Sequence, residues 1–294
     1  MKILLTGKDG QVGFALHKKL STLGEVIATD RKTLDLFNLK VVKQFIDRLR
    51  PDMIINTAAY TAVDKAESEA TLAHQINVLA PKVLAEKASE LNIPLVHFST
   101  NYVFDGLKKE AYKEDDLTHP LSVYGETKAH GEVAVKQHSK HIIFRTSWVF
   151  GTHRHNFLKT LLRLASERDQ LSMVSDQWSH PTSASTLSEV TFKIVDSLFK
   201  NSNFKDYGTY HVANEGETNW HDYALFILRE AKAFGFPIKV EPHSIKPILT
   251  SDYPTPASRP LNSRLNTEKL KKTFMLELPH WQAEVKKVLS MLPH

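Results

Sequence analysis

Three glycines near the N-terminus constrain the fold of this chain more than any other feature. They lie in the segment Thr6-Gly7-Lys8-Asp9-Gly10-Gln11-Val12-Gly13, between an apolar run at residues 2–5 and a stretch whose apolar residues recur with helical spacing. A glycine turn between a strand and a helix lets an anion approach the backbone N–H groups that open the helix. The sequence therefore predicts a turn that binds the pyrophosphate of a dinucleotide. The residues assigned to the cofactor in this turn are Gly7, Gly10, Gln11, Val12 and Gly13.

A carboxylate, Asp30, follows the second apolar run of the chain. In dinucleotide-binding folds a carboxylate at this point hydrogen-bonds the 2′-hydroxyl of NADH and repels the 2′-phosphate of NADPH. Arg31 comes directly after it and can neutralise that phosphate, or can lie in a solvated loop. The sequence therefore leaves the choice between NADPH and NADH open.

Apolar runs alternate with amphipathic stretches through the first half of the chain. The runs lie at residues 2–5, 25–29, 52–56, 94–99 and 141–146, and further helices are expected at 156–170 and 185–199. This alternation is typical of parallel strands joined by helical crossovers. We therefore predict an α/β fold with a Rossmann-like, doubly wound parallel sheet that forms an NAD(P)-binding domain over residues 1–213, with parts of 150–185 on the substrate side. Residues 214–294 are expected to form a smaller substrate-binding domain.

Composition excludes several classes of protein. The 294 residues contain no cysteine, which rules out disulfides and thiolate catalysis. No run of about 18 apolar residues and no leader is present, so we expect a cytoplasmic protein without a membrane partner. The net charge of +5 comes from 38 basic and 33 acidic residues spread along the chain, which predicts no nucleic-acid partner.

Tyr124 and Lys128 are spaced for acid catalysis. Four residues apart on a helix, they would lie about 6 Å apart on one face. A neighbouring ammonium lowers the pKa of a tyrosine from its ordinary value of about 10, which would make Tyr124 a general acid, and Lys128 could also hold the nicotinamide ribose. Thr100 follows the run at 94–99 and is placed to hydrogen-bond the reacting carbonyl. Taken alone, a Tyr-x-x-x-Lys pair is as consistent with an ordinary pair on the surface of an amphipathic helix as with a catalytic pair.

Together these motifs resemble the extended short-chain dehydrogenase/reductases. Longer stretches at residues 60–67, 123–128, 144–149 and 259–265 are similar to the dTDP-4-dehydrorhamnose reductases of that superfamily. The resemblance implies that hydride from NADPH or NADH reduces dTDP-4-dehydro-6-deoxy-L-mannose to dTDP-L-rhamnose, with Tyr124 as general acid. It also implies a place in nucleotide-sugar and lipopolysaccharide biosynthesis.

The resemblance assigns further residues by position. Asp30, Asp35 and Leu36 would contact the adenosine end of the cofactor, and Ala59, Tyr60 and Thr61 would line the nicotinamide side. Thr100, Asn101, Tyr124 and Trp148 would contact the sugar nucleotide, and Arg259 and Arg264 its phosphates. Asn101 departs from the family, which usually has Asp at this position.

Some members of the family form dimers through magnesium held by glutamates. The corresponding positions in this chain are Ala15, Ser185 and Met291, which cannot replace those carboxylates. His153 and His155 have no third ligand at a recognisable spacing. We therefore predict no metal site and a monomer or weak homodimer.

Two other functions remain open at this point. One is a non-catalytic role, because the regulatory subunit of methionine adenosyltransferase also resembles this family. The other is a sugar-nucleotide epimerase or dehydratase, which shares the short motifs but regenerates its nicotinamide.

Overall fold

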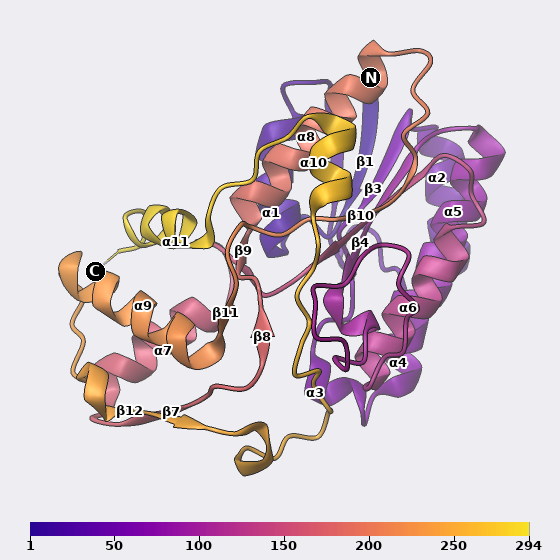
Figure 1. Ribbon diagram of the computed structural model, residues 1–294. Helices are drawn as coiled ribbons and strands as arrows, with labels where there is room; N and C mark the ends of the chain where they lie inside the picture. Colours follow the sequence, from indigo (N-terminus) through magenta and orange to yellow (C-terminus); the bar gives the residue numbers. More distant parts are fainter. Residues whose placement is uncertain (294) are drawn as a thin grey trace.

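The structure, a computed structural model, describes residues 1–293 and is built around one parallel sheet. Six strands lie in the order β10-β5-β4-β3-β1-β2, and every neighbouring pair is parallel (Figure 1). The strands are β1 (Lys2–Thr6), β2 (Glu25–Thr29), β3 (Met53–Asn56), β4 (Leu95–Thr100), β5 (His141–Thr146) and β10 (Gly208–His211). The α/β fold class and the five strands predicted from the sequence are confirmed.

The strand β10 was not predicted, because its sequence gives little signal. It has only four residues, begins at a glycine with a φ of 134°, and contains two polar side chains. Pairing with β5 at the edge of the sheet, rather than an apolar run of its own, places it in the sheet.

Helices cover both faces of the sheet (Figure 1). One layer contains α1 (Gln11–Leu20), α8 (Ala184–Lys200) and α10 (Glu268–Phe274), and the other contains α2 (Leu39–Leu49), α5 (Ala80–Leu91) and α6 (Val123–Val135). Successive strand residues point to opposite faces, so Ile3 and Leu5 pack in one hydrophobic cluster and Leu4 in the other. Strands buried on both faces explain why the first half of the chain reads as nearly continuous apolar runs.

An irregular helical segment joins β3 to α5. It consists of α3 (Val63–Ala66), α4 (Ala70–His74) and a π-helical turn, Gln75–Leu79, that runs directly into α5. Asn77 of this turn hydrogen-bonds both the N–H and the carbonyl of Tyr60, and its amide donates to Thr127 Oγ1. The turn thereby fixes the loop after β3 against α6.

A third hydrophobic cluster lies beside the sheet, among α7 (Phe157–Glu167), α9 (Trp220–Ala233) and α11 (Trp281–Leu289). Short strand pairs surround it: β6 (Val149–Phe150) with β9 (Thr182–Ser183), β7 (Leu171–Val174) with β12 (Ile245–Ile248), and β8 (Trp178–Ser179) with β11 (Thr218–Asn219). The remaining short helices are η2 (Asn101–Val103), η3 (Pro242–Ser244) and η4 (Thr250–Asp252). The helices predicted at 156–170 and 185–199 are confirmed as α7 and α8.

The two parts of the chain interleave. Residues of α7, which precedes residue 213, pack in the cluster beside the sheet. Leu270 of α10, which follows residue 213, packs in the cluster that contains Ile3 and Leu5 of β1. The domain boundary after residue 213 remains a prediction.

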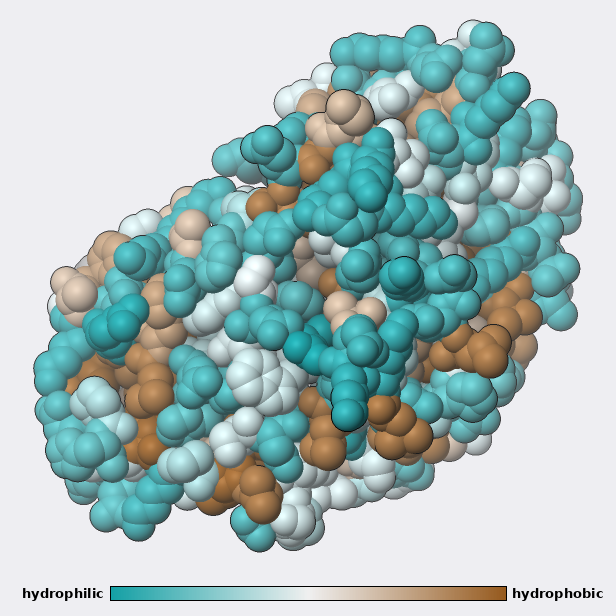
Figure 2. Space-filling view, viewed as in Figure 1, coloured by the Kyte–Doolittle hydropathy of each residue, from teal (hydrophilic) through white to brown (hydrophobic). Residues whose placement is uncertain are grey.

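Hydrophilic residues cover most of the face shown in Figure 2, and apolar residues gather in separate groups along its lower side. Among residues 1–293, no helix is both long and apolar enough to cross a membrane.

Candidate active site

A cavity of about 890 Å³ lies beyond the carboxyl ends of the sheet strands. Thr6, Thr29, Thr100 and Thr146, the last residues of β1, β2, β4 and β5, all line it. The predicted site residues that line it are Gly7, Gly10, Gln11, Val12, Asp30, Arg31, Asp35, Leu36, Ala59, Tyr60, Thr61, Thr100, Asn101, Tyr124, Lys128 and Trp148. The fold therefore brings the residues predicted for a dinucleotide and those predicted for the reaction to one cavity.

The glycine turn packs closely against the backbone around it. Gly7 has a φ of 76°, and a Cβ added to it would lie 2.8 Å from Ala58 N. Gly13 does not line the cavity; a Cβ there would lie 2.1 Å from Gly7 O, so its role is to let α1 pack against the turn. No side chain caps α1 and no acidic residue lies in its first turn. Its N-terminal N–H groups can therefore receive an anion.

Asp30 has partners from its own loop and from the glycine turn. Its Oδ1 accepts hydrogen bonds from Lys32 N at 2.9 Å and Thr33 N at 2.8 Å, and its Oδ2 lies 3.1 Å from Lys8 Nζ. Hydrogen bonds from Thr33 and the ion pair with Lys8 hold the pKa of Asp30 well below its usual range. Lys8 was not predicted as part of this site, although its position in the glycine turn offered a signal.

Tyr124 and Lys128 lie in the first two turns of α6. The helix begins after Ser122, whose hydroxyl accepts a hydrogen bond from Gly125 N at 3.2 Å. Burial raises the pKa of Tyr124 to about 12, and a hydrogen bond from Thr100 opposes that rise. Burial also lowers the pKa of Lys128 to about 8.

The expected effect of Lys128 on Tyr124 differs from what the structure shows. The Lys128 ammonium donates to Phe98 O at 2.6 Å and lies 3.3 Å from His97 Nε2, so its nearest partners belong to β4. The hydroxyl that lowers the pKa of Tyr124 belongs to Thr100. Helical spacing predicted a shared face for the two side chains, but the partners of each are set by β4.

Two aromatic side chains form one wall of the cavity. Trp148 and Trp220 both line it, and their rings stack at 3.6 Å with an interplanar angle of 16°. Trp148 has a φ of 41°, a left-handed conformation that is unusual for a tryptophan. Trp220 was not predicted, because it opens α9, far from Trp148 in the sequence.

A buried hydroxyl at the end of β5 also lines the cavity. Thr146 Oγ1 has no hydrogen-bond partner in the part of the chain that the structure describes. A buried polar atom without a partner is costly, so a bound ligand would gain a ready hydrogen bond there.

Asn101 connects the sheet to the second part of the chain. Its amide nitrogen donates to Ser179 Oγ and to Ser263 O, both at 3.0 Å. A carboxylate in this conformation could not donate to the Ser263 carbonyl. The contacts give the departure from the family pattern a structural role in this chain.

Arg259 and Arg264 do not line the cavity. Arg259 Nη2 donates to Asp64 Oδ2 at 2.7 Å, and this hydrogen bond lowers the pKa of Asp64. Arg264 Nη1 pairs with Glu217 Oε2 at 2.8 Å. Both guanidinium groups have carboxylate partners, and their contact with substrate phosphates remains a prediction.

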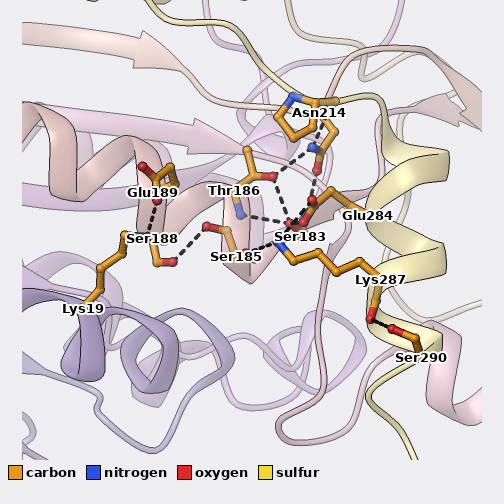
Figure 3. Close-up of polar contacts among 11 residues, drawn as sticks. Lys19, Ser183, Ser185, Thr186, Ser188, Glu189, Asn214, Glu284, Lys287 and Ser290 are labelled. Atoms are coloured by element: carbon orange, nitrogen blue, oxygen red, sulfur yellow. Dashed lines mark hydrogen bonds and ion pairs between the residues drawn. The ribbon is translucent and has the colours of Figure 1, made fainter.

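The positions that correspond to metal-binding glutamates lie where α1, α8 and α11 approach one another. Ser185 Oγ accepts a hydrogen bond from Lys287 Nζ at 3.2 Å (Figure 3). Behind it, the Glu284 carboxylate accepts a hydrogen bond of 2.5 Å from Ser183 Oγ. His153 stacks on Phe14, and within residues 1–293 no group of three or more His, Cys, Asp or Glu side chains could hold a metal ion.

Comparison with known proteins identifies similar chains across the whole length. The family model described as RmlD substrate binding domain matches residues 1–293. A dTDP-4-dehydrorhamnose reductase from Shigella flexneri is 44% identical over 297 residues, which cover 99% of this chain and 98% of that protein.

Two solved structures are also similar. The crystal structure of a dTDP-4-dehydrorhamnose reductase from Clostridium acetobutylicum has a TM-score of 0.90 and 38% identity, and covers 99% of both chains. That of the enzyme from Bacillus anthracis in complex with NADP has a TM-score of 0.90 and 34% identity, and covers 98% of both chains.

Proposed function

This chain belongs to the dTDP-4-dehydrorhamnose reductase family, and from that premise we propose that it reduces dTDP-4-dehydro-6-deoxy-L-mannose to dTDP-L-rhamnose with NADPH or NADH. The observation that carries the proposal is that Thr100, Tyr124 and Lys128 line the same cavity as the glycine turn. This shared cavity supports the assignment of Tyr124 as proton donor to a reaction of a dinucleotide bound at the turn.

Different residues of this chain bind the cofactor and donate the proton. The glycine turn and the start of α1 hold the pyrophosphate, and Lys128, which lines the cavity, holds the nicotinamide ribose. When bound, the reduced nicotinamide supplies the hydride that adds to C4 of the sugar. Tyr124 donates its proton to the carbonyl oxygen, which becomes the C4 hydroxyl.

The pKa of Tyr124, at about 12, keeps the phenol protonated at neutral pH, as a proton donor requires, although burial makes it a weaker acid than an exposed tyrosine. The hydrogen bond with Thr100 stabilises the phenolate that remains after transfer. The Trp148–Trp220 wall offers an apolar face to the deoxysugar or its base.

Incubation of the purified protein with dTDP-4-dehydro-6-deoxy-L-mannose and NADPH, and separately with NADH, tests the proposal. We expect one reduced nicotinamide to be consumed for each dTDP-L-rhamnose formed. An epimerase or dehydratase would change the sugar without net consumption of added cofactor. A non-catalytic subunit would leave both sugar and cofactor unchanged, and either result would refute the proposal.

A further inference from the structure

A line of buried polar side chains crosses three strands and ends at Lys128. The strand register places Thr6 of β1 opposite Asn56 of β3, and Asn56 opposite His97 of β4. Thr6 Oγ1 lies 2.6 Å from the Asn56 amide, which lies 3.0 Å from His97 Nδ1. His97 Nε2 in turn lies 3.3 Å from Lys128 Nζ. All four residues are at most 2% exposed.

His97 has no part in the reaction proposed above, yet it occupies the centre of the sheet. A buried polar side chain weakens a core unless its hydrogen bonds are made, and the neighbouring strand residues Val96 and Phe98 are apolar. Burial, together with the charge of Lys128, holds the pKa of His97 well below its ordinary value, so the ring is neutral. A neutral imidazole offers one donor nitrogen and one acceptor nitrogen.

The ammonium determines which ring nitrogen is the acceptor. A lysine ammonium has three N–H donors and no acceptor, so Nε2 of His97 must accept. The ring proton then lies on Nδ1. The Asn56 amide, drawn with its nitrogen toward Nδ1 and its oxygen accepting from Thr6 Oγ1, is accordingly assigned the reversed orientation, in which its oxygen accepts from Nδ1 and its nitrogen donates to Thr6 Oγ1. With Phe98 O as the second acceptor, two of the three N–H groups of Lys128 point at β4, and one is left for a ligand.

We propose that His97 is a positioning residue for Lys128: its Nε2 accepts a hydrogen bond from the ammonium and, with the carbonyl of Phe98, holds Nζ where it meets the nicotinamide ribose. The proposal rests on the proposed function only through the ribose contact of Lys128. The link from Thr6 to His97 also ties that contact to the strand that carries the glycine turn.

Other charged and titratable groups surround Lys128. They are His97 on β4 and Glu132 on α6, with Arg145 on β5 paired to Glu132, and Tyr124 on α6, whose ring contacts that of Tyr102 on η2. Glu132 favours the ammonium, but it is paired with Arg145 at 2.7 Å and lies 3.5 Å from Lys136. The His97 acceptor favours the charged form of Lys128, so its removal should lower the pKa of that ammonium.

Two substitutions of His97 separate positioning from packing. Asparagine places an amide where Nδ1 lies and cannot reach Lys128, whereas glutamine places its amide oxygen near the position of Nε2. For His97→Asn we expect about 10-fold weaker NADPH binding, measured by fluorescence titration, because the ammonium loses a fixed partner. The alkaline limb of kcat/KM should move down by about 0.5 to 1 pH unit. His97→Gln should keep most of the wild-type NADPH affinity and most of the wild-type position of the alkaline limb.

His211→Asn is the matched control, because His211 is as buried as His97 and lies on β10 without a contact to Lys128. It should leave NADPH affinity and the pH limb unchanged. Equal effects of His97→Asn and His97→Gln, or no effect of either, would overturn the proposal. If the wild type binds NADPH but does not reduce the dTDP-sugar, the proposed function fails, while the NADPH titrations still decide the role of His97.

Discussion

Tyr124 and Lys128 lie one helical turn apart on α6, yet their polar partners come from different residues of β4. Thr100 bonds the tyrosine, and Phe98 O and His97 bond the lysine. Burial moves the pKa of both groups away from the charged form, to about 12 for the phenol and about 8 for the ammonium. At neutral pH the tyrosine therefore holds its proton and Lys128 is still charged.

Tyr124→Phe should reduce turnover by about 10²- to 10⁴-fold, the usual contribution of a positioned general acid. Cofactor affinity should stay close to wild type, because the ring and the glycine turn remain. Steady-state kinetics and NADPH titration measure the two effects. Tyr207→Phe, which removes a hydroxyl away from the cavity, serves as the control, and near-normal turnover of Tyr124→Phe would assign the proton to another group.

Arg31 lines the cavity beside a carboxylate whose charge is already paired with Lys8. The repulsion that Asp30 would exert on a 2′-phosphate is thereby reduced, so we expect the enzyme to accept both NADPH and NADH. Arg31→Ala should lower kcat/KM for NADPH about 10-fold and leave that for NADH nearly unchanged. Lys32→Ala, a cation of the same loop that does not line the cavity, is the control. An equal loss of kcat/KM with NADPH and with NADH would show that Arg31 does not discriminate between the two cofactors.

At the scale of elements, an ion pair joins α6, which carries Tyr124 and Lys128, to β5. Arg145 donates to Glu132 Oε1 at 2.9 Å and to Oε2 at 2.7 Å, and Ser99 Oγ adds a third hydrogen bond to Oε1. Burial raises the pKa of Glu132, but the hydrogen bonds from Arg145 outweigh it and the net pKa is lowered. Both side chains are almost fully buried, so neither charge can be solvated if the other is removed.

Arg145→Met should therefore lower the free energy of unfolding by about 3–5 kcal/mol, because it leaves the buried Glu132 carboxylate with only the Ser99 hydroxyl and the half-exposed Lys136 as partners. Removing both charges, in Arg145→Met with Glu132→Gln, should recover much of this loss. Denaturant titration measures the effect. Arg163→Met breaks an exposed pair with Glu167 on α7 and should cost less than about 1 kcal/mol. If Arg145→Met lowered the free energy of unfolding by no more than the control does, the Arg145–Glu132 pair would not stabilise the packing of α6.

At the scale of the whole molecule, the question is whether metal ions bring two copies together. Ala15, Ser185 and Met291 replace the carboxylates that would bind magnesium, and Lys287 places an ammonium beside Ser185 (Figure 3). An ammonium at this place would repel a divalent cation.

We therefore expect EDTA, and separately added magnesium, to leave both the oligomeric state and the turnover unchanged. Size-exclusion chromatography with light scattering measures the first, and the reductase assay the second. A change in mass or activity on chelation would place a metal site elsewhere in the molecule.

Local sequence determined five of the six strands of the sheet and the glycine turn. The apolar runs that became β1, β3, β4 and β5 are buried on both faces, and Gly7 and Gly13 are required by backbone approaches shorter than any Cβ would allow. Both signals lie within a few consecutive residues, so they can be read without knowing the rest of the chain. The positions of the predicted cofactor residues around one cavity follow from parallel strands whose carboxyl ends share an edge.

Tertiary structure alone decided which side chains interact in and around the cavity. The pairing of Lys8 with Asp30, the stacking of Trp220 on Trp148, and the chain from Thr6 to Lys128 join residues that are distant in sequence. The charge state of a buried group depends on every element packed around it, and helical spacing describes only its own helix. For the same reason, helical spacing alone predicted that Lys128 lowers the pKa of Tyr124. In the structure, burial and Thr100 of β4 set that pKa, and Lys128 donates to Phe98 O of β4 instead.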